Sequence, residues 1–390
     1  MRVLQIVKTN EGASWALAQA RSLHEGGVDV VTVLPSLDGG MASEYEGLGM
    51  RTIKGDFTLP LRVPWLLLRR IEEIRRVVSQ VEPDIIHCHF VTNIMMLRLA
   101  LRRSRIPRLF QVPGPLHLEH WPSRLAEITL ATRSDYWAAA CKATRELYLR
   151  SGVPSGRVLL AYYGGYGGAA CDEYVEGDGR LRRQFGIPQN AVLVGMVSYF
   201  YKPKRYLLQR RGLKGHEDFI DAIALVRTRH PEVVGVIIGG AWGNADSYVE
   251  RVKAYADQRC RDSVVFTGFR SDLKMVYREL GVAVHPSHSE NLGGAAESLA
   301  AGVPTVSTTV GGFPDIVLDG ETGLTARPRC PQELAEAIVR MVEDPEMARA
   351  MAQAGKRLVH RMLDIESTSS VVLDGYQKIL QAQAVGGPHG

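Results

Sequence analysis

The sequence predicts an α/β protein of two doubly wound domains with similar design. Short, almost continuously apolar strands alternate with helical stretches, and this alternation starts again near residue 191. Strands covered on both faces of a parallel sheet lose the apolar–polar alternation of half-exposed strands. Glycine accounts for 39 of 390 residues, which indicates many tight turns or close backbone approaches to a ligand.

The first half opens with a strand, a turn and a helix. Residues 3–7 are apolar, Gly12 follows in a turn, a helical pattern covers 14–23, and the next strand covers 28–34. This order is a βαβ unit, so its strands pair in parallel with a right-handed crossover. The other elements expected in this half are a helix over 64–81 and strands over 84–89, 109–112, 136–139 and 157–162.

The second half repeats this order after a polar stretch over 172–190, where apolar periodicity lapses. The expected strands are 191–197, 235–238, 264–267, 282–285 and 305–307, and the expected helices are 216–229, 246–258, 295–301 and those from 331 to about 383. We place the domains at 1–180 and 181–364. Because ligands of such sheets bind beyond the carboxyl ends of the strands, the cleft between the domains is the expected site.

Charge and cysteine content exclude several classes. A formal net charge of +5 is small for a nucleic-acid-binding surface. Five scattered cysteines without a CxxC pair argue against disulfides or structural zinc and favour a reducing cytoplasm. No apolar stretch is long enough to span a membrane, and the basic helix over 64–81 fits core packing better than membrane contact. The oligomeric state stays open between monomer and homodimer.

The segment 285–304, HPSHSENLGGAAESLAAGVP, concentrates the chemistry. It follows a strand, turns at Gly293–Gly294 and enters a helix of small residues. A helix N-terminus behind such a turn offers unpaired N–H groups and a positive dipole end to a phosphate. Glu290 and Glu297 place two carboxylates near one pocket. The alternative is that Glu297 only compensates the helix dipole and Glu290 is solvated.

This segment resembles the donor site of the retaining glycosyltransferases of family 4, the glycosyl transferases group 1. The likeness extends over nearly the whole chain and is carried in order by the Gly12 loop and residues 83–87, 214–215, 238–240, 266–269, 290–293, 297–304, 310–317 and 319–323. It implies the GT-B fold, with an acceptor domain first, a nucleotide-sugar domain second, and a last helix at about 365–383 that crosses back to the first. It also implies sugar transfer with retention from a UDP- or GDP-linked donor, without a metal or other cofactor, and no D-x-D motif is present.

The resemblance also assigns roles to residues. Lys214 would contact the donor diphosphate, Glu290 the transferred sugar and Glu297 the ribose. Asn291, Leu292 and Gly293 would offer backbone N–H groups. The other implied donor-binding residues are Gly12, Gly239, Phe269, Arg270 and Gly294.

The acceptor side is expected to include Trp15, His89, His117 and Glu119. His117, in the loop after a strand, would contact the donor sugar or relay a proton. The alternative is a loop histidine bonded to backbone.

Three departures from the family pattern affect these assignments. Six residues separate Glu290 from Glu297 where the family has seven, which a loop before the helix would absorb. The arginine expected after the strand 191–197 is missing, and Lys204 and Arg211 are the candidate replacements among the cations Lys202, Lys204, Arg205, Arg210 and Arg211. The usual first-domain glycine pair is reduced to Gly12-Ala13.

Other motifs favour simpler explanations. The glycine-rich run 165–170 resembles a dinucleotide fingerprint but precedes no periodic helix. His87 and His89 could ligate a metal, but without a third ligand a buried structural pair is favoured.

The segment 289–298, SENLGGAAES, resembles family members that act on aminocyclitols. This resemblance implies a small polar acceptor such as an aminocyclitol, a sugar or a thiol metabolite of natural-product or antibiotic biosynthesis. Two other functions stay open. They are a nucleotide-sugar epimerase on the same fold and a degenerate, non-catalytic nucleotide-sugar-binding protein.

Overall fold

The computed structural model describes residues 1–60, 63–166, 177–204 and 209–385. The chain divides into two units, Met1–Gly165 with the segment from Leu363 onward, and Tyr166–Met362. This division differs from the predicted boundary between residues 180 and 181. Most of the glycine-rich run 165–170, together with Cys171 and Arg205, lies outside the described residues.

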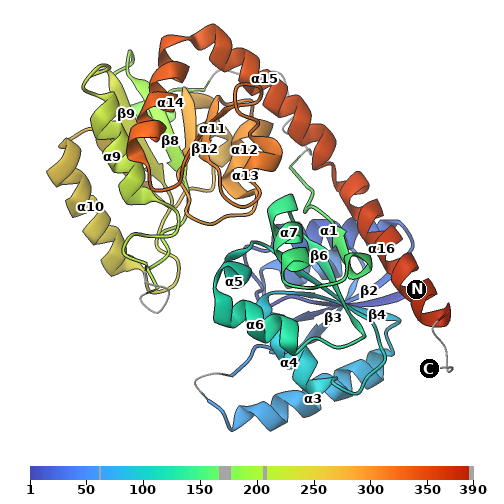
Figure 1. Ribbon diagram of the computed structural model, residues 1–390. Helices are drawn as coiled ribbons and strands as arrows, with labels where there is room; N and C mark the ends of the chain where they lie inside the picture. Colours follow the sequence, from blue (N-terminus) through green and yellow to red (C-terminus); the bar gives the residue numbers. More distant parts are fainter. Residues whose placement is uncertain (61–62, 167–176, 205–208, 386–390) are drawn as a thin grey trace. The chain divides into compact units, whose positions relative to one another are not determined.

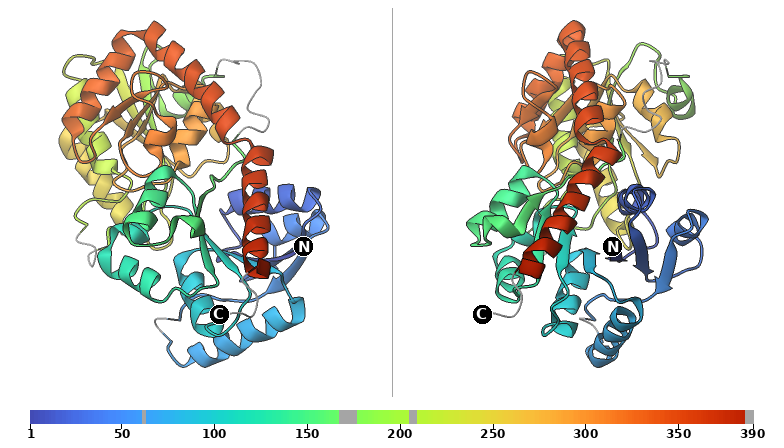
Figure 2. Two further views of the ribbon diagram at one scale, coloured as in Figure 1. Left: turned by 45° about the vertical axis from the view of Figure 1, so that its right-hand side comes forward. Right: turned by 90° about the vertical axis from the view of Figure 1, so that its right-hand side faces the viewer.

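The first unit is built on a seven-stranded parallel sheet in the order β3-β2-β1-β4-β5-β6-β7 (Figure 1). Its strands are β1 (Arg2–Ile6), β2 (Asp29–Leu34), β3 (Arg51–Lys54), β4 (Ile85–His89), β5 (Arg108–Val112), β6 (Asp135–Ala139) and β7 (Val158–Leu160). Its helices are α1 (Ser14–Glu25), α2 (Met41–Gly47), α3 (Leu66–Val81), α4 (Val91–Ala100), α5 (Leu116–Glu119), α6 (Trp121–Thr129), α7 (Lys142–Arg150) and α16 (Ile365–Val385). The last helix, α16, packs beside α1 (Figures 1 and 2).

The second unit repeats this plan with a six-stranded parallel sheet in the order β10-β9-β8-β11-β12-β13. Its strands are β8 (Val192–Val197), β9 (Val233–Ile238), β10 (Val264–Gly268), β11 (Val282–His285), β12 (Thr305–Thr308) and β13 (Leu324–Ala326). Its helices are α8 (Arg180–Phe185), α9 (His216–Val226), α10 (Asp246–Cys260), α11 (Leu273–Glu279), α12 (Gly293–Ala300), α13 (Phe313–Ile316), α14 (Pro331–Glu343) and α15 (Pro345–Met362). The predicted class, two doubly wound parallel-sheet domains, is confirmed.

Each sheet is buried on both faces, which explains its apolar strands. In β1, Leu4 and Ile6 belong to the core on one face, and Val3 belongs to the core on the other. In β8, Val194 belongs to the core on one face of the sheet and Leu193 belongs to the core on the other. Because successive strand side chains point to opposite faces, two covered faces require an uninterrupted apolar run.

Several elements were not predicted, and α4 shows why. This helix is buried around most of its circumference, at positions that include Asn93, Ile94, Met96 and Leu97. Such a helix lacks the apolar stripe by which an amphipathic helix is identified. The short strands β3 and β13 were missed as well.

Two negative findings concern the part of the chain that the structure describes. None of its helices combines the length and apolarity needed to cross a membrane. No disulfide joins the four cysteines within it.

Candidate functional site

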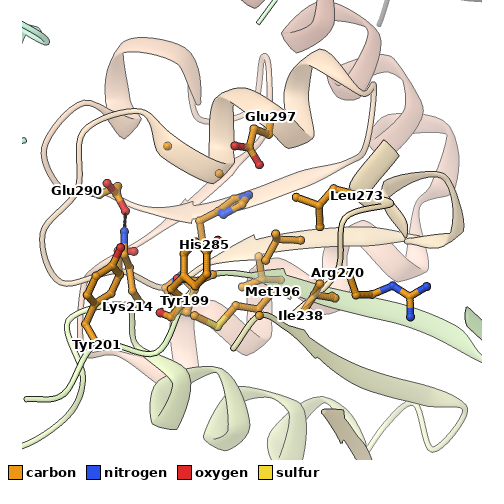
Figure 3. A pocket seen from close by; sticks show the side chains of 18 of the residues that line it. Met196, Tyr199, Tyr201, Lys214, Ile238, Arg270, Leu273, His285, Glu290 and Glu297 are labelled. Atoms are coloured by element: carbon orange, nitrogen blue, oxygen red, sulfur yellow. Dashed lines mark hydrogen bonds and ion pairs between the residues drawn. The ribbon is translucent and has the colours of Figure 1, made fainter. Parts of the chain in front are cut away.

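A pocket lies beyond the carboxyl ends of β8 and β11, the two central strands of the second sheet (Figure 3). The strand order reverses at this point, and doubly wound sheets bind their ligands there. All lining residues belong to the second unit. The predicted donor-site residues that line the pocket are Lys214, Gly239, Phe269, Arg270, Glu290, Gly293, Gly294 and Glu297.

Lys214 and Glu290 form an ion pair in this pocket, with their charged ends directed at each other (Figure 3). Their side chains are 19% and 15% exposed, so the pair is accessible from the pocket. Burial alone would lower the pKa of Lys214, but the Glu290 carboxylate outweighs it and the pKa is raised. Lys214 is therefore a fixed cation, and Tyr201 places its ring 5.6 Å from the ammonium.

Glu290 lies in the loop before α12, three residues ahead of its first residue, Gly293. The shortened spacing to Glu297 is therefore absorbed in a loop, as predicted. Glu290 Oε1 accepts a hydrogen bond from the backbone N–H of Asn291 at 3.0 Å, which ties the carboxylate to its own loop.

Glu297 stands on α12, and its Oε2 accepts a hydrogen bond from the Tyr277 hydroxyl at 3.1 Å. Glu297 is exposed to solvent, and it lines the concave surface of the pocket. Desolvation there raises the pKa of Glu297, the Glu290 charge adds to this, and the Tyr277 hydroxyl opposes it. The carboxylate keeps one oxygen available to a ligand.

Gly239 lets two strand-end loops meet closely. Its φ is +144°, and a Cβ at this position would lie 2.0 Å from the carbonyl oxygen of Ser198. Residues with a side chain therefore cannot occupy this position without moving the loop after β8. The pocket wall is backbone at this point.

Phe269 was predicted, but its aromatic neighbours Tyr199 and Trp242 were missed, and the three rings form an aromatic wall. Tyr199 follows β8, and its ring lies 5.1 Å from the Trp242 ring and 6.3 Å from the Phe269 ring, the latter stacked. Phe269 is 68% exposed. Exposed aromatic faces offer flat apolar area to a ring-shaped ligand. The run of aromatic residues directly after a strand was the available signal.

His285, the last residue of β11, is a second lining residue that was missed. Its Nε2 lies 2.9 Å from the Ser298 hydroxyl, and burial lowers the pKa of the ring to about 3. The imidazole is therefore neutral at physiological pH. Its position at the end of a central strand was the signal.

The predicted replacement cations lie outside this pocket. Arg211 pairs with Asp218 and, at 2.8 Å, with Asp221, because these nearly buried carboxylates need a counter-charge. Lys204 is exposed, and its backbone N–H donates to Gln209 Oε1. Neither Arg211 nor Lys204 lines the pocket that contains Lys214.

Two other predicted donor-binding residues are almost fully buried. Asn291 and Leu292 are 8% and 1% exposed. Arg270 lines the pocket, but its guanidinium extends away from Lys214 and Glu290 (Figure 3) and pairs with Asp272 at 2.6 Å.

The predicted acceptor residues lie in the first unit. His89 is fully buried, with Nδ1 3.1 Å from the Tyr163 hydroxyl, and the ring of Trp15 packs 5.2 Å away. His87 Nδ1 lies 2.5 Å from the Tyr376 hydroxyl. Both histidines are buried and bonded to tyrosines. In the described residues, no group of three or more His, Cys, Asp or Glu side chains could hold a metal ion.

His117 also faces protein. Its side chain is 8% exposed, and Nε2 lies 3.2 Å from the Tyr148 hydroxyl and 3.6 Å from Glu127 Oε2. Burial lowers the pKa of His117, although the Glu127 carboxylate opposes this shift.

Two further predicted residues of the first unit are exposed. Glu119 is the last residue of α5, and Gly12 lies in the loop after β1 with φ +70°.

Comparisons with known proteins agree with the fold. Solved structures with the GT-B fold match this chain over nearly its whole length. HepE from Anabaena in complex with UDP-glucose superposes with a TM-score of 0.79 at 20% identity, covering 97% of this chain and 99% of that one. Sucrose-phosphate synthase from Thermosynechococcus elongatus gives a TM-score of 0.78 at 20% identity, covering 98% and 100%. The protein therefore has the GT-B fold.

Family models match both units. Residues 203–358 match the model of the glycosyl transferases group 1, and residues 12–164 match that of the glycosyl transferase 4-like domain. Each unit of the chain is therefore similar to one of these two glycosyltransferase families.

Curated relatives match over a smaller part. D-inositol 3-phosphate glycosyltransferase of Corynebacterium jeikeium is 33% identical over 48% of this chain and 44% of its own length. 2-Deoxystreptamine glucosyltransferase of Streptomyces kanamyceticus is 28% identical over 52% and 49%. The chain spans about half the length of these curated relatives.

Proposed function

We propose that this protein is a retaining, metal-independent glycosyltransferase that moves a sugar from a UDP- or GDP-linked donor to a small polar acceptor. The Lys214–Glu290 pair carries the proposal. It places an accessible, permanently charged ammonium beyond the central strands of the second sheet, with Glu297 in the same pocket. HepE, which shares the fold, has been solved with UDP and with UDP-glucose.

The chemistry follows from where charge develops. Transfer breaks the bond between the anomeric carbon of the sugar and a diphosphate oxygen, and negative charge grows on the departing diphosphate. Lys214 stabilises that charge, and charge-assisted hydrogen bonds of this kind contribute about 1.5–3 kcal/mol. A bound diphosphate competes with Glu290 for the ammonium, which leaves the Glu290 carboxylate available to sugar hydroxyls.

Retention requires the acceptor to attack on the face that the diphosphate leaves. The acceptor oxygen, nitrogen or sulfur forms the new bond to the anomeric carbon, and its proton passes to the departing phosphate oxygen. This chain then needs no nucleophile of its own. The aromatic wall of Tyr199 and Phe269 is suited to the nucleobase, and Glu297 to the ribose hydroxyls.

The acceptor proposed is an aminocyclitol, a sugar or a thiol metabolite of natural-product biosynthesis in the cytoplasm. The names of two relatives support the cyclitol class, because inositol and 2-deoxystreptamine are both polyhydroxylated six-membered carbocycles.

A thermal-shift screen with UDP, GDP and ADP, followed by turnover with the matching sugar donors, tests the function. Ligand at a hundredfold excess over Kd should stabilise the protein by about 2.7 kcal/mol. Glu297→Ala should bind the stabilising nucleotide about tenfold or more weakly, since a charged hydrogen bond to the ribose is lost.

The outcomes separate the candidates. An unchanged melting temperature with all three nucleotides would refute the donor site. Interconversion of the donor sugar without any acceptor would identify an epimerase. Nucleotide-sugar binding without turnover across an acceptor panel would identify a binding protein.

A further inference from the structure

The two charged groups of the pocket lie on separate irregular loops. Lys214 precedes α9, and Glu290 lies between β11 and α12. Neither Lys214 nor Glu290 lies within a helix or a strand. Other contacts must therefore set the distance between the ammonium and the carboxylate.

Asp218, in the first turn of α9, is bonded to both loops. Its Oδ1 accepts a hydrogen bond from Arg211, which lies three residues before Lys214. Its Oδ2 lies 2.5 Å from Nε2 of His288, which lies two residues before Glu290, so the imidazole N–H donates to the carboxylate. Asp218 is 3% exposed. We call Arg211, Asp218 and His288 the Asp218 bridge.

Backbone contacts hold the same two loops together. The N–H of His288 donates to the carbonyl of Leu213 at 2.8 Å. Gly215 has φ +76°, and a Cβ there would lie 2.0 Å from the carbonyl oxygen of Pro286. The loops are therefore in contact beside the Lys214–Glu290 pair.

Arg211 and Asp218 are both charged in the bridge. Burial would raise the pKa of Asp218, but hydrogen bonds and charge from His288 and Arg211 lower it, so the carboxylate stays ionised. Arg211 is held at its other side by Asp221, whose Oδ2 lies 2.8 Å from Nη2. Arg211, Asp218 and His288 line a separate depression and not the donor pocket. They can act on a pocket ligand only through the two loops.

We infer that the Asp218 bridge positions Lys214 against Glu290 for a bound diphosphate, so that Arg211 and His288 are positioning residues and not phosphate ligands. The inference rests on the proposed function. The bridge controls affinity for the phosphate end of the nucleotide and leaves the nucleobase and ribose end unaffected, because that end meets other elements of the pocket.

Two variants of His288 separate the hydrogen bond from the ring. His288→Gln keeps an N–H donor near the Nε2 position, whereas His288→Leu removes it. The measurement is the affinity of each variant for UDP and for UMP by calorimetry, or for GDP and GMP if the wild-type protein prefers guanine nucleotides. In His288→Leu the preference for diphosphate over monophosphate should fall about fivefold to tenfold, with monophosphate affinity unchanged. His288→Gln should keep the wild-type preference.

Arg259→Gln is the matched control. Arg259 also pairs with Asp221, at 2.8 Å. Within the described residues it forms no ion pair or hydrogen bond with either loop, so its loss should leave the diphosphate preference unchanged. If His288→Leu does not fold, Arg211→Gln compared with Arg211→Lys makes the same test, since lysine can retain one ion pair.

The results distinguish failure of the inference from failure of the function. Equal weakening of monophosphate and diphosphate, an unchanged preference in His288→Leu, or identical behaviour of the Leu and Gln variants would overturn the bridge alone. A wild-type protein that binds no nucleotide would overturn the proposed function and the bridge with it.

Discussion

The two units have sheets of the same design, but the polar side chains at their strand ends differ in accessibility. In both, the chain order reverses at the centre of the sheet, between β1 and β4 and between β8 and β11. Beyond β8 and β11, Lys214 and Glu290 remain accessible to a ligand. At the end of β4 and after β5, His89 and His117 are buried against Tyr163, Tyr148 and Glu127.

This difference shows that position at a strand end does not by itself make a residue available. A buried polar group must be bonded, and a partner inside the protein then occupies the atom that a substrate would use. Lys214 and Glu290 of the second unit line an accessible pocket, whereas His89 and His117 of the first unit are bonded to other protein groups.

Lys214→Ala should have the largest effect, because it removes the accessible cation of the second unit. Turnover should fall by about 10²–10³, the usual loss when one preorganised donor to a developing charge is removed. The control is Lys253→Ala, an exposed lysine paired with Glu250 on α10. Steady-state kinetics with the stabilising donor measure both, and wild-type turnover in Lys214→Ala would place the diphosphate elsewhere.

His117→Ala tests the first unit. The change removes one buried partner of Tyr148 and Glu127, which still bond each other at 3.3 Å. The free energy of unfolding should therefore fall by about 0.5–1.5 kcal/mol, the net contribution of one hydrogen bond. Affinity for the nucleotide should not change, because all lining residues of the donor pocket belong to the second unit. Urea unfolding and calorimetry measure the two quantities. His120→Ala is the control, and stability equal to wild type in His117→Ala would contradict the buried network.

The smallest effect concerns pH, with one histidine in each unit. Burial lowers the pKa of His87 and of His285 to about 3, against an ordinary value near 6.5. The unfolded chain therefore binds more protons below pH 6.5, so stability is full above 6.5 and falls as pH drops from 6.5 towards 3.

Each of these histidines contributes at most about 1.4 kcal/mol per pH unit, so His87→Gln and His285→Gln should each flatten the pH dependence by no more than that amount. Urea unfolding at pH 7.5, 6.5 and 5.5 measures the slope. Equal slopes in wild type and both variants would mean that each ring has the same pKa in the folded and the unfolded protein.

Much of the fold could be predicted from local patterns. The strand 282–285 and the starts of the helices at 14, 216 and 246 agree with the structure. The helix α4 could not be predicted, because a helix that is buried on most sides has no periodic apolar stripe. In the site, Lys214, Glu290 and Glu297 were predicted and do line one pocket, while Tyr199 and His285 were missed.

The sequence by itself determined the alternation of strands and helices, the repeated sheet plan and the glycine-flanked segment that carries Glu290 and Glu297, because these depend on neighbours within a few turns or strands. Only the tertiary structure decided which cation serves the pocket. Arg211 and Lys214 are three residues apart, yet Arg211 pairs with Asp218 while Lys214 pairs with Glu290, 76 residues further on. A charged side chain is committed by the partner that folding brings within a few ångströms, and that partner is not encoded in the residues beside it.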